Sequence, residues 1–322
     1  MKRTLHHLSA ICLGMLLFGC AAPETSDSEK KDLNFIFITT VVGEDFFIPV
    51  KKGMEDAARL MGVNCTFTGT EGVDIPAQAE MVRQAIRDDC DGIALNIIDP
   101  EGFDEVISEA VEAGIPVIAF NTDDHETTNA RMSSVCQRLY NAGTVLGQEA
   151  AKYIPDGSEI LMTMHDEGIS ALEDRLRGAQ NGLVEAGKKD IKWKVTITGS
   201  SVTESAEVIG SILQTHPQIK YVLCTGQADT EGAGVAISKL NADLGHKAAG
   251  FDLSPGILQH VLQGNIAFTI DQQPYIQGFY PVIQLTLFKR YGIIPASMDT
   301  GASLITRENA ESVLEMAKQH YR

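Results

Sequence analysis

Residues 91–121 read DGIALNIIDPEGFDEVISEAVEAGIPVIAFN, and this stretch decides the fold. It begins with an apolar run of strand length, over 91–98. Apolar residues then recur at helical spacing over 103–114, and a second apolar run covers 115–121. A strand, a helix and a second strand in this order form a βαβ unit, whose two strands lie parallel.

The same alternation extends along the rest of the chain. Strands are predicted over 33–39, 65–70, 158–164, 192–198, 219–225 and 247–251. Helices are predicted over 46–62, 75–88, 141–153, 171–187, 204–214, 231–240 and 254–263. So many strands exceed what one compact sheet of this length holds. The sequence therefore predicts an α/β fold with two smaller, doubly wound parallel sheets.

Length and charge limit the classes of function. A chain of 322 residues is longer than one hydrophobic core usually serves, which favours two lobes. Asp and Glu number 43 against 26 Lys and Arg, which gives a formal net charge of −17. A field of this sign repels phosphate backbones, so we predict no nucleic-acid partner.

The first residues indicate export. A basic start and a short apolar stretch precede Cys20, and Leu17, Gly19 and Cys20 resemble the bacterial lipobox, whose cysteine is acylated. We therefore predict a signal peptide over 1–19, lipidation of Cys20 and a flexible tether over 20–32. The chain would then lie in the periplasm or at the cell surface, attached to the membrane through its lipid anchor only. An ordinary signal peptide or a retained anchor is the alternative.

Cysteine and histidine spacing indicates no metal site. Cys65, Cys90, Cys136 and Cys224 match no zinc pattern, and we predict buried free thiols, although a Cys90–Cys136 bridge stays open. The histidines beyond the signal are scattered and are predicted to lie at the surface: 125, 165, 216, 246, 260 and 320.

Polar and aromatic residues follow several predicted strands. They are Glu44 to Phe47, Asn96, Asn121 to Asp124, Gln227 to Asp229, and Asp252. In open parallel sheets, ligands bind outside the carboxyl ends of the strands. If two lobes face each other, these groups converge on one cleft, which is the architecture of a binding site.

The sequence gives little sign of catalysis. It contains no G-x-S-x-G elbow, no P-loop and no H-E-x-x-H motif. We therefore predict a protein that is not an enzyme and has no cofactor. An exported glycosidase is the enzyme alternative, with Asp123 and Asp124 as paired acids.

Six segments occur in an order and spacing typical of one family. They are the Phe pair at 46–47, LNIIDP, GIPVIAFNTD, ALEDRLRG, GFDLSP and TIDQQP. From Leu33 to Thr306 the chain resembles the periplasmic-binding-protein type I family, the sugar-binding components of bacterial ABC importers, in its ribose-binding-like branch.

The resemblance implies the organisation of the chain. It implies two Rossmann-like lobes that are joined by a three-segment hinge and close on a sugar. The N-terminal lobe would comprise 33–135 and 273–301, and the C-terminal lobe 136–272 and 302–322. The resemblance also implies a monomer.

The resemblance assigns most of the candidate ligand-binding residues. Phe46 and Phe47 match the aromatic pair that stacks on the sugar ring. Polar matches are Asn96, Arg175, Asp252 and Gln272. Aromatic faces suit the C–H surfaces of a sugar, and carboxylate, amide and guanidinium groups suit its hydroxyls.

Departures from the family pattern supply the remaining candidates. Asn121 stands where the ribose binder has an aspartate, and Asp123 is predicted to supply the carboxylate instead. Gln227 and Asp229 are both candidates for a missing asparagine of the second lobe. Glu44, which follows Gly43 at the cleft rim, completes the set.

The implied function is capture of a monosaccharide and its delivery to the permease and ATPase subunits of an ABC importer. A pentose, a hexose, a deoxyhexose or a cyclitol would suit these residues. A second hypothesis is a sensor of a sugar or a furanosyl autoinducer, which presents its closed form to a chemoreceptor or a histidine kinase.

Overall fold

The computed structural model describes residues 32–99, 101–123 and 128–322. Residues 32–322 form one compact unit. The predicted signal peptide, Cys20 and all of the tether except Asp32 lie outside the described residues. Within the described ranges, no helix is long and apolar enough to cross a bilayer.

The first sheet is entirely parallel. Its strand order is β11-β5-β4-β3-β1-β2. The chain runs from β3 to β4 and β5 on one side of β1 and places β2 on the other, so the direction of winding changes between β1 and β3. The strands are β1 (Asn34–Thr39), β2 (Asn64–Gly69), β3 (Gly92–Leu95), β4 (Val117–Asn121), β5 (Ser133–Cys136) and β11 (Met298–Asp299).

The second sheet repeats this order. It runs β12-β10-β9-β8-β6-β7, and it is parallel except for the antiparallel pair β10 and β12. Winding changes direction between β6 and β8. The strands are β6 (Glu159–Met164), β7 (Lys192–Ile197), β8 (Tyr221–Cys224), β9 (Lys247–Phe251), β10 (Ile266–Asp271) and β12 (Ser303–Thr306).

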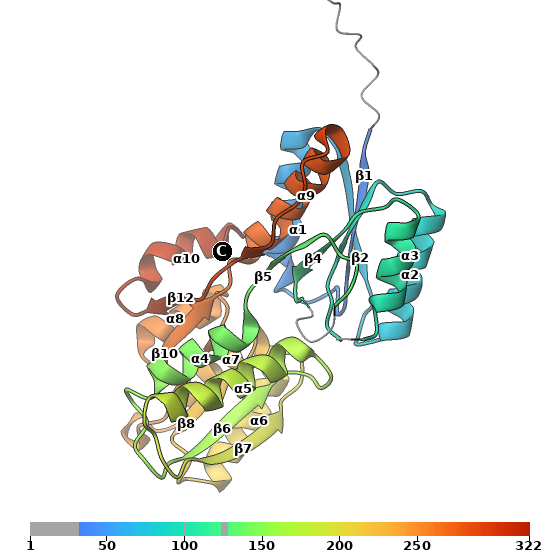
Figure 1. Cartoon of the computed structure of the whole chain (residues 1–322). Coiled ribbons are helices and arrows are strands. Elements are labelled where there is room, and N and C mark those ends of the chain that lie inside the picture. The colour runs from blue at the N-terminus through green and yellow to red at the C-terminus, as the bar shows by residue number, and fades with distance from the viewer. Residues whose placement is uncertain (1–31, 100, 124–127) are drawn as a thin grey trace, which may run out of the picture. The chain divides into compact units, whose positions relative to one another are not determined.

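Helices connect the parallel strands of both sheets and cover them (Figure 1). Those between strands of the first sheet are α1 (Phe47–Met61), α2 (Ile75–Arg87) and α3 (Asp104–Glu112). The later helices are α4 (Leu139–Ala150), α5 (Ser170–Glu185), α6 (Val202–Thr215), α7 (Gln227–Ser238), the short 3-10 helix η1 (Ala242–Leu244), α8 (Pro255–Gln263), α9 (Pro274–Tyr291) and α10 (Ala310–Lys318). Two α/β lobes result, as the sequence predicts.

The chain passes between the two sheets three times. It leaves the first sheet after β5, returns after β10, and leaves again between β11 and β12. Side chains tie these crossings together: Gln137 Nε2 donates to the carbonyl of Gly301 at 2.8 Å, and Gln273 Nε2 donates to the carbonyl of Thr300 at 2.7 Å. Hydrogen bonds therefore join the three crossings into one hinge.

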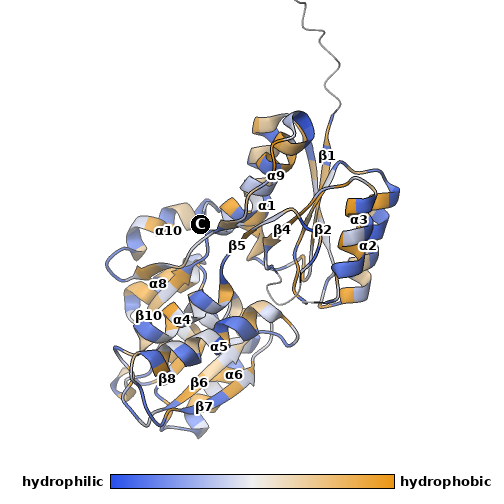
Figure 2. Ribbon diagram, in the orientation of Figure 1, coloured by the Kyte–Doolittle hydropathy of each residue, from blue (hydrophilic) through white to orange (hydrophobic). Residues whose placement is uncertain are grey.

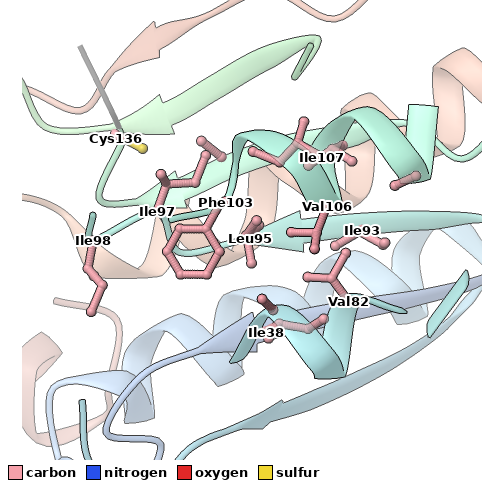
Figure 3. Packing of buried hydrophobic residues seen from close by; sticks show 14 of the residues in the cluster. Ile38, Val82, Ile93, Leu95, Ile97, Ile98, Phe103, Val106, Ile107 and Cys136 are labelled. Atoms are coloured by element: carbon pink, nitrogen blue, oxygen red, sulfur yellow. The ribbon is translucent and has the colours of Figure 1, made fainter. Parts of the chain in front are cut away.

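Apolar side chains fill both faces of each sheet. In Figure 2 the outer helices α2 and α3 carry hydrophilic stretches, whereas the strands are mostly apolar. Figure 3 shows part of the cluster between the first sheet and these helices, where Phe103 lies beside Leu95 and Ile97. Strands buried on both faces explain the continuous apolar runs of the sequence.

Several elements depart from the sequence prediction. Strands β5, β10, β11 and β12 and helices α9 and α10 were not among the predicted segments. Helix α7 begins at Gln227 rather than at 231, because the Asp229 carboxylate caps its first turn. The thiols of Cys65, Cys90, Cys136 and Cys224 are all free, so the alternative Cys90–Cys136 bridge is not formed.

Candidate functional site: a polar cleft between the two sheets

The carboxyl ends of strands from both sheets line a cleft of about 520 Å³. Its lining includes Glu44 after β1, Asn96 after β3, and Asn121 at the end of β4. The second lobe contributes Gln227 after β8 and Asp252 after β9. A volume of this size lies in the range typical of small-molecule sites.

A chain of side-chain hydrogen bonds runs along the cleft from one lobe to the other. Asn96 Nδ2 donates to Asn121 Oδ1 at 2.8 Å. Asn121 Nδ2 donates to Gln277 Oε1 at 3.1 Å and to Gln272 Oε1 at 3.4 Å. Gln272 Nε2 donates to Asp252 Oδ1 at 2.7 Å. These bonds fix the directions of the polar groups before a ligand enters.

Two of these residues have backbone conformations that are uncommon outside glycine. Asn121 has φ = 64° and Asp252 has φ = 74°. They occupy matching places, at the carboxyl ends of β4 and β9. Short polar side chains tolerate this left-handed region better than other side chains do. Strained positions of this kind cluster at ligand sites, so the pair supports a binding role for both residues.

Arg175 is the buried cation of the cleft. Only 3% of its surface is exposed. Its guanidinium donates to Gln137 Oε1 at 2.7 Å and to the carbonyl of Thr225 at 2.9 Å, and it lies 4.1 Å from the centroid of the Phe251 ring. Burial lowers the pKa of Arg175, which Asp252 and Asp229 oppose by charge. Burial likewise raises the pKa of Asp252, and the nearby Arg175 opposes that shift.

Glycines allow the helix that carries Arg175 to lie close to α4. A Cβ atom built on Gly143 of α4 would lie 2.3 Å from the carbonyl oxygen of Arg175. One built on Gly178 of α5 would lie 2.1 Å from the carbonyl oxygen of Tyr140. Only glycine permits this approach at both positions, and the close packing sets the position of Arg175 over the cleft.

The two phenylalanines after β1 line the cleft differently. Phe46 and Phe47 pack edge to face at 5.1 Å between centroids. Phe47 is 4% exposed and belongs to the apolar core under α1, whereas Phe46 is half-buried at the cleft edge. Both touch the cleft, and Phe46 offers it the larger free surface.

Two predicted ligand residues do not line the cleft. Asp229 is fully buried and accepts hydrogen bonds from Thr163 Oγ1 at 2.7 Å and from the backbone amides of Thr225 and Gly226. Asp123 is bonded to Arg131 at 3.1 Å. Both carboxylates have partners within the protein, and neither is among the described residues that line the cleft, which argues against the predicted ligand contact.

The remaining predicted residues lie together around the cleft. They are Glu44, Phe46, Phe47, Asn96, Asn121, Arg175, Gln227, Asp252 and Gln272. Sequence reasoning missed His165, which lines the cleft rather than the surface, and also Gln137 and Gln277, whose amides orient the lining residues. The position of His165 just after β6 is the signal that could have found it.

The lobes also touch beside the cleft. The backbone amide of Ser170, at the start of α5, donates to the carbonyl of Ile98 at 3.2 Å. Ile98, Ile169 and Leu172 join the same apolar cluster. Contacts of this kind bury apolar surface only while the lobes are together. Among the described residues, no three His, Cys, Asp or Glu side chains are placed to hold a metal ion.

Residues 35–286 match the periplasmic binding protein domain. The chain belongs to this family. It is 33% identical over 301 residues to the xylose/arabinose-binding protein XylF of Sulfolobus acidocaldarius, a match that covers 89% of this chain and 74% of that protein. It is 24% identical to the ribose import binding protein RbsB of Bacillus subtilis, over 80% of this chain and 82% of that protein.

The fold of this periplasmic binding protein agrees with solved structures. A carbohydrate transporter from Acidothermus cellulolyticus, solved in complex with myo-inositol, superposes with a TM-score of 0.78 at 26% identity. The match covers 90% of this chain and 100% of that chain. The two-lobed arrangement predicted from the sequence is therefore the arrangement of the family.

Proposed function

We propose that this periplasmic binding protein captures a neutral monosaccharide or cyclitol in the cleft and delivers it to an ABC importer. One observation carries the proposal: a series of side-chain hydrogen bonds runs from one lobe to the other, beside the buried Arg175. It joins Asn96, Asn121, Gln272 and Asp252. Closure around the ligand would then be favoured by contacts that each lobe supplies only in the closed form.

The chemistry of these groups suits a polyol. A sugar hydroxyl both donates and accepts, and an unpaired hydroxyl buried in a dry cleft costs about 1–3 kcal/mol. Amides donate and accept, carboxylates accept, and a guanidinium donates in a planar fork. Asn96 Oδ1 is buried and has no hydrogen-bond partner among the described residues, so it is free to accept from a ligand.

The names of the relatives support the same class of ligand. XylF is named for xylose and arabinose, and RbsB for ribose. The A. cellulolyticus protein was solved with myo-inositol. Each of these ligands is an uncharged polyol that forms a single ring. None of these relatives is named as an enzyme, which supports binding without turnover.

Calorimetric titration of the purified protein tests the proposal. The panel is D-xylose, L-arabinose, D-ribose, D-fructose and myo-inositol, with a charged sugar acid as the contrast. We expect tight binding of one neutral member and its recovery unchanged. A folded protein that binds none of the neutral sugars, or that converts one of them, would contradict the proposal.

We further propose that acylated Cys20 anchors the mature protein to the membrane as a monomer. The lipobox-like segment that ends at Cys20 supports this anchor. Mass spectrometry of the membrane fraction tests it, since acylation adds the mass of the lipid and Cys20→Ala abolishes it. Release of the unchanged wild-type protein into the soluble fraction would contradict the anchor while leaving sugar binding untouched.

Delivery to an importer is tested separately. With the permease and ATPase subunits of a candidate importer in reconstituted vesicles, we expect the sugar-loaded protein to stimulate ATP hydrolysis. Stimulation of a histidine kinase or a chemoreceptor instead would favour the sensor hypothesis.

A further inference from the structure

Two titratable side chains face each other across the cleft from equivalent places in the two lobes. Glu44 follows β1 of the first sheet, and His165 follows β6 of the second. The strands β1 and β6 occupy the same place in their sheets, next to the point where the direction of winding changes. Ligands of open parallel sheets bind at this point, so the pair lies where a ligand is expected. His165 Nε2 lies 3.7 Å from Glu44 Oε1.

The pair is enclosed, yet its two members do not satisfy each other. A separation of 3.7 Å is too long for a hydrogen bond. Glu44 Oε1 and His165 Nδ1 are both buried and have no hydrogen-bond partner among the described residues. His165 Nδ1 lies against Gly226, whereas Nε2 is the ring atom that faces Glu44. Buried polar atoms in native proteins nearly always have partners, so Glu44 Oε1 calls for one on the cleft side. Both residues line the cleft, where a bound molecule supplies such a partner.

The backbone makes room for the imidazole at this place. A Cβ atom on Gly226, at the start of α7, would lie 2.5 Å from His165 Nδ1. Any other residue at 226 would therefore displace the imidazole from the cleft wall. The position of His165 is thus built into the second lobe and is not an accident of an exposed loop.

Burial changes the protonation of the two groups in opposite directions. Burial raises the pKa of Glu44 from its ordinary 4.5 to about 7, and the charges of Asp166, Asp252 and Asp229 add to the shift. Burial lowers the pKa of His165 from 6.5 to about 4; Asp166 opposes that shift, and Arg175 adds to it. In the closed cleft near pH 5.5, both side chains are therefore uncharged.

We propose that Glu44 and His165 are specificity-determining residues that hold one neutral ligand hydroxyl between the lobes when the cleft closes. This inference rests on the proposed function, because it assigns the pair to the same ligand. In an open cleft both groups meet water and titrate normally. On closure near pH 5.5 the imidazolium releases one proton and the carboxylate takes up one, so the net uptake is zero.

The direction in which each residue changes the affinity with pH follows from the difference between its pKa in the open form and in the closed form. Glu44 has a raised pKa in the closed form, so its contribution to affinity is lost as pH rises from about 4.5 to about 7. His165 has a lowered pKa in the closed form, so its contribution is gained as pH rises from about 4 to about 6.5. The two slopes oppose each other over nearly the same range of pH.

The test measures the dissociation constant at pH 5.5 and 7.5 with the tightest-binding member of the neutral sugar panel. For the wild type we expect a change of roughly threefold or less. In His165→Gln, where only Glu44 titrates, affinity rises on the order of tenfold from pH 7.5 to 5.5. In Glu44→Gln, where only His165 titrates, it falls on the order of tenfold.

Each result has a distinct meaning. His216→Gln is the matched control and should follow the wild type, because His216 lies at the carboxyl end of α6, whereas the amino end of α6 lines the cleft. If the wild type binds sugar and both cleft variants keep its flat profile, the pairing is wrong while the proposed function stands. If the wild type binds no sugar of the panel, the proposed function itself fails.

Discussion

The two lobes bring equivalent strand ends to one cleft but supply different chemistry there. The first lobe contributes the amides of Asn96 and Asn121, the carboxyl group of Glu44 and the ring of Phe46. The second contributes amides as well, but it alone supplies the buried ions Arg175 and Asp252. Both sheets have the same strand order, and the strands that end at the cleft correspond, so the difference lies in the side chains.

Because of this difference, we expect the two lobes to contribute differently to ligand binding. Amides both donate and accept, and they tolerate either orientation of a hydroxyl. Buried ions give stronger hydrogen bonds, but each one depends on its partners to stay buried. The second lobe should therefore supply most of the affinity, and the first lobe should supply the fit to one ring.

Loss of the buried cation gives the largest expected effect. Arg175→Ala removes the hydrogen bonds of the guanidinium to Gln137 and Thr225 and the positive charge that opposes the burial of Asp252. Leaving a buried hydrogen-bonding group unpaired costs about 1–3 kcal/mol, and several groups are affected here. We expect affinity to fall by about a hundredfold or more, and thermal unfolding to shift to lower temperature, as measured by titration and calorimetry.

A matched arginine on the same helix is the control. Arg177 is largely exposed and pairs with Asp174 one turn before it on α5. Arg177→Ala should change affinity by less than about twofold. Equal losses in the two variants would remove the special role of Arg175.

A methyl group between α4 and α5 tests how the second lobe positions its cation. In Gly143→Ala, the new Cβ atom would lie 2.3 Å from the carbonyl oxygen of Arg175, so α5 must move. Overpacking of this kind costs about 1–3 kcal/mol of unfolding free energy, and affinity should fall by about tenfold. Chemical denaturation and titration measure the two effects.

Gly210→Ala provides the comparison for that substitution. Its Cβ atom would meet no atom closer than 3.8 Å, inside α6. Because alanine is the better helix former by about 1 kcal/mol, this variant should be as stable as the wild type or more stable. If Gly143→Ala binds as tightly as Gly210→Ala, the helix contact does not set the position of Arg175.

The first lobe is tested through its amide. Asn121→Gly removes the side chain that joins Asn96 to Gln272 and keeps the positive φ of 64° accessible. We expect affinity to fall by about tenfold, which is the cost of about one to two hydrogen bonds. Titration against several sugars should also show weaker discrimination. A loss as large as that of Arg175→Ala would overturn the proposed division between the lobes.

Among the predicted ligand residues, the smallest effect is expected for Asp123. Its carboxylate is bonded to Arg131 and does not line the cleft. Asp123→Asn should therefore change affinity by less than about threefold, because no ligand contact is lost. A tenfold loss in the titration would place Asp123 in the site after all.

The fold could be predicted from the sequence because buried parallel strands and amphipathic helices leave clear patterns. The segment 91–121 contains strand, helix and strand in the order that the structure has. The short strands β5, β11 and β12 could not be predicted. The strands β3 and β8 also have four residues, but they lie within longer apolar runs that mark them, which the other three lack. Their pairing depends on partners that are distant in sequence.

Most of the lining residues could be predicted because they follow strands that end at one edge. The sequence does not show which carboxylates already accept hydrogen bonds from the protein itself. Asp229 and Asp252 both follow apolar strands, yet Asp229 caps α7 whereas Asp252 faces the cleft. His165 was missed because its position opposite Glu44 depends on how the two lobes face each other, and Glu44 lies far from it in sequence.

Hydrogen exchange with and without the bound sugar tests the central claim most directly. The claim is that one ligand engages both lobes. We predict that the tightest-binding sugar slows exchange in segments 40–47, 96–98 and 121–123 of the first lobe and, at the same time, in 165–175, 225–228 and 252–254 of the second. Protection confined to the segments of one lobe would contradict it.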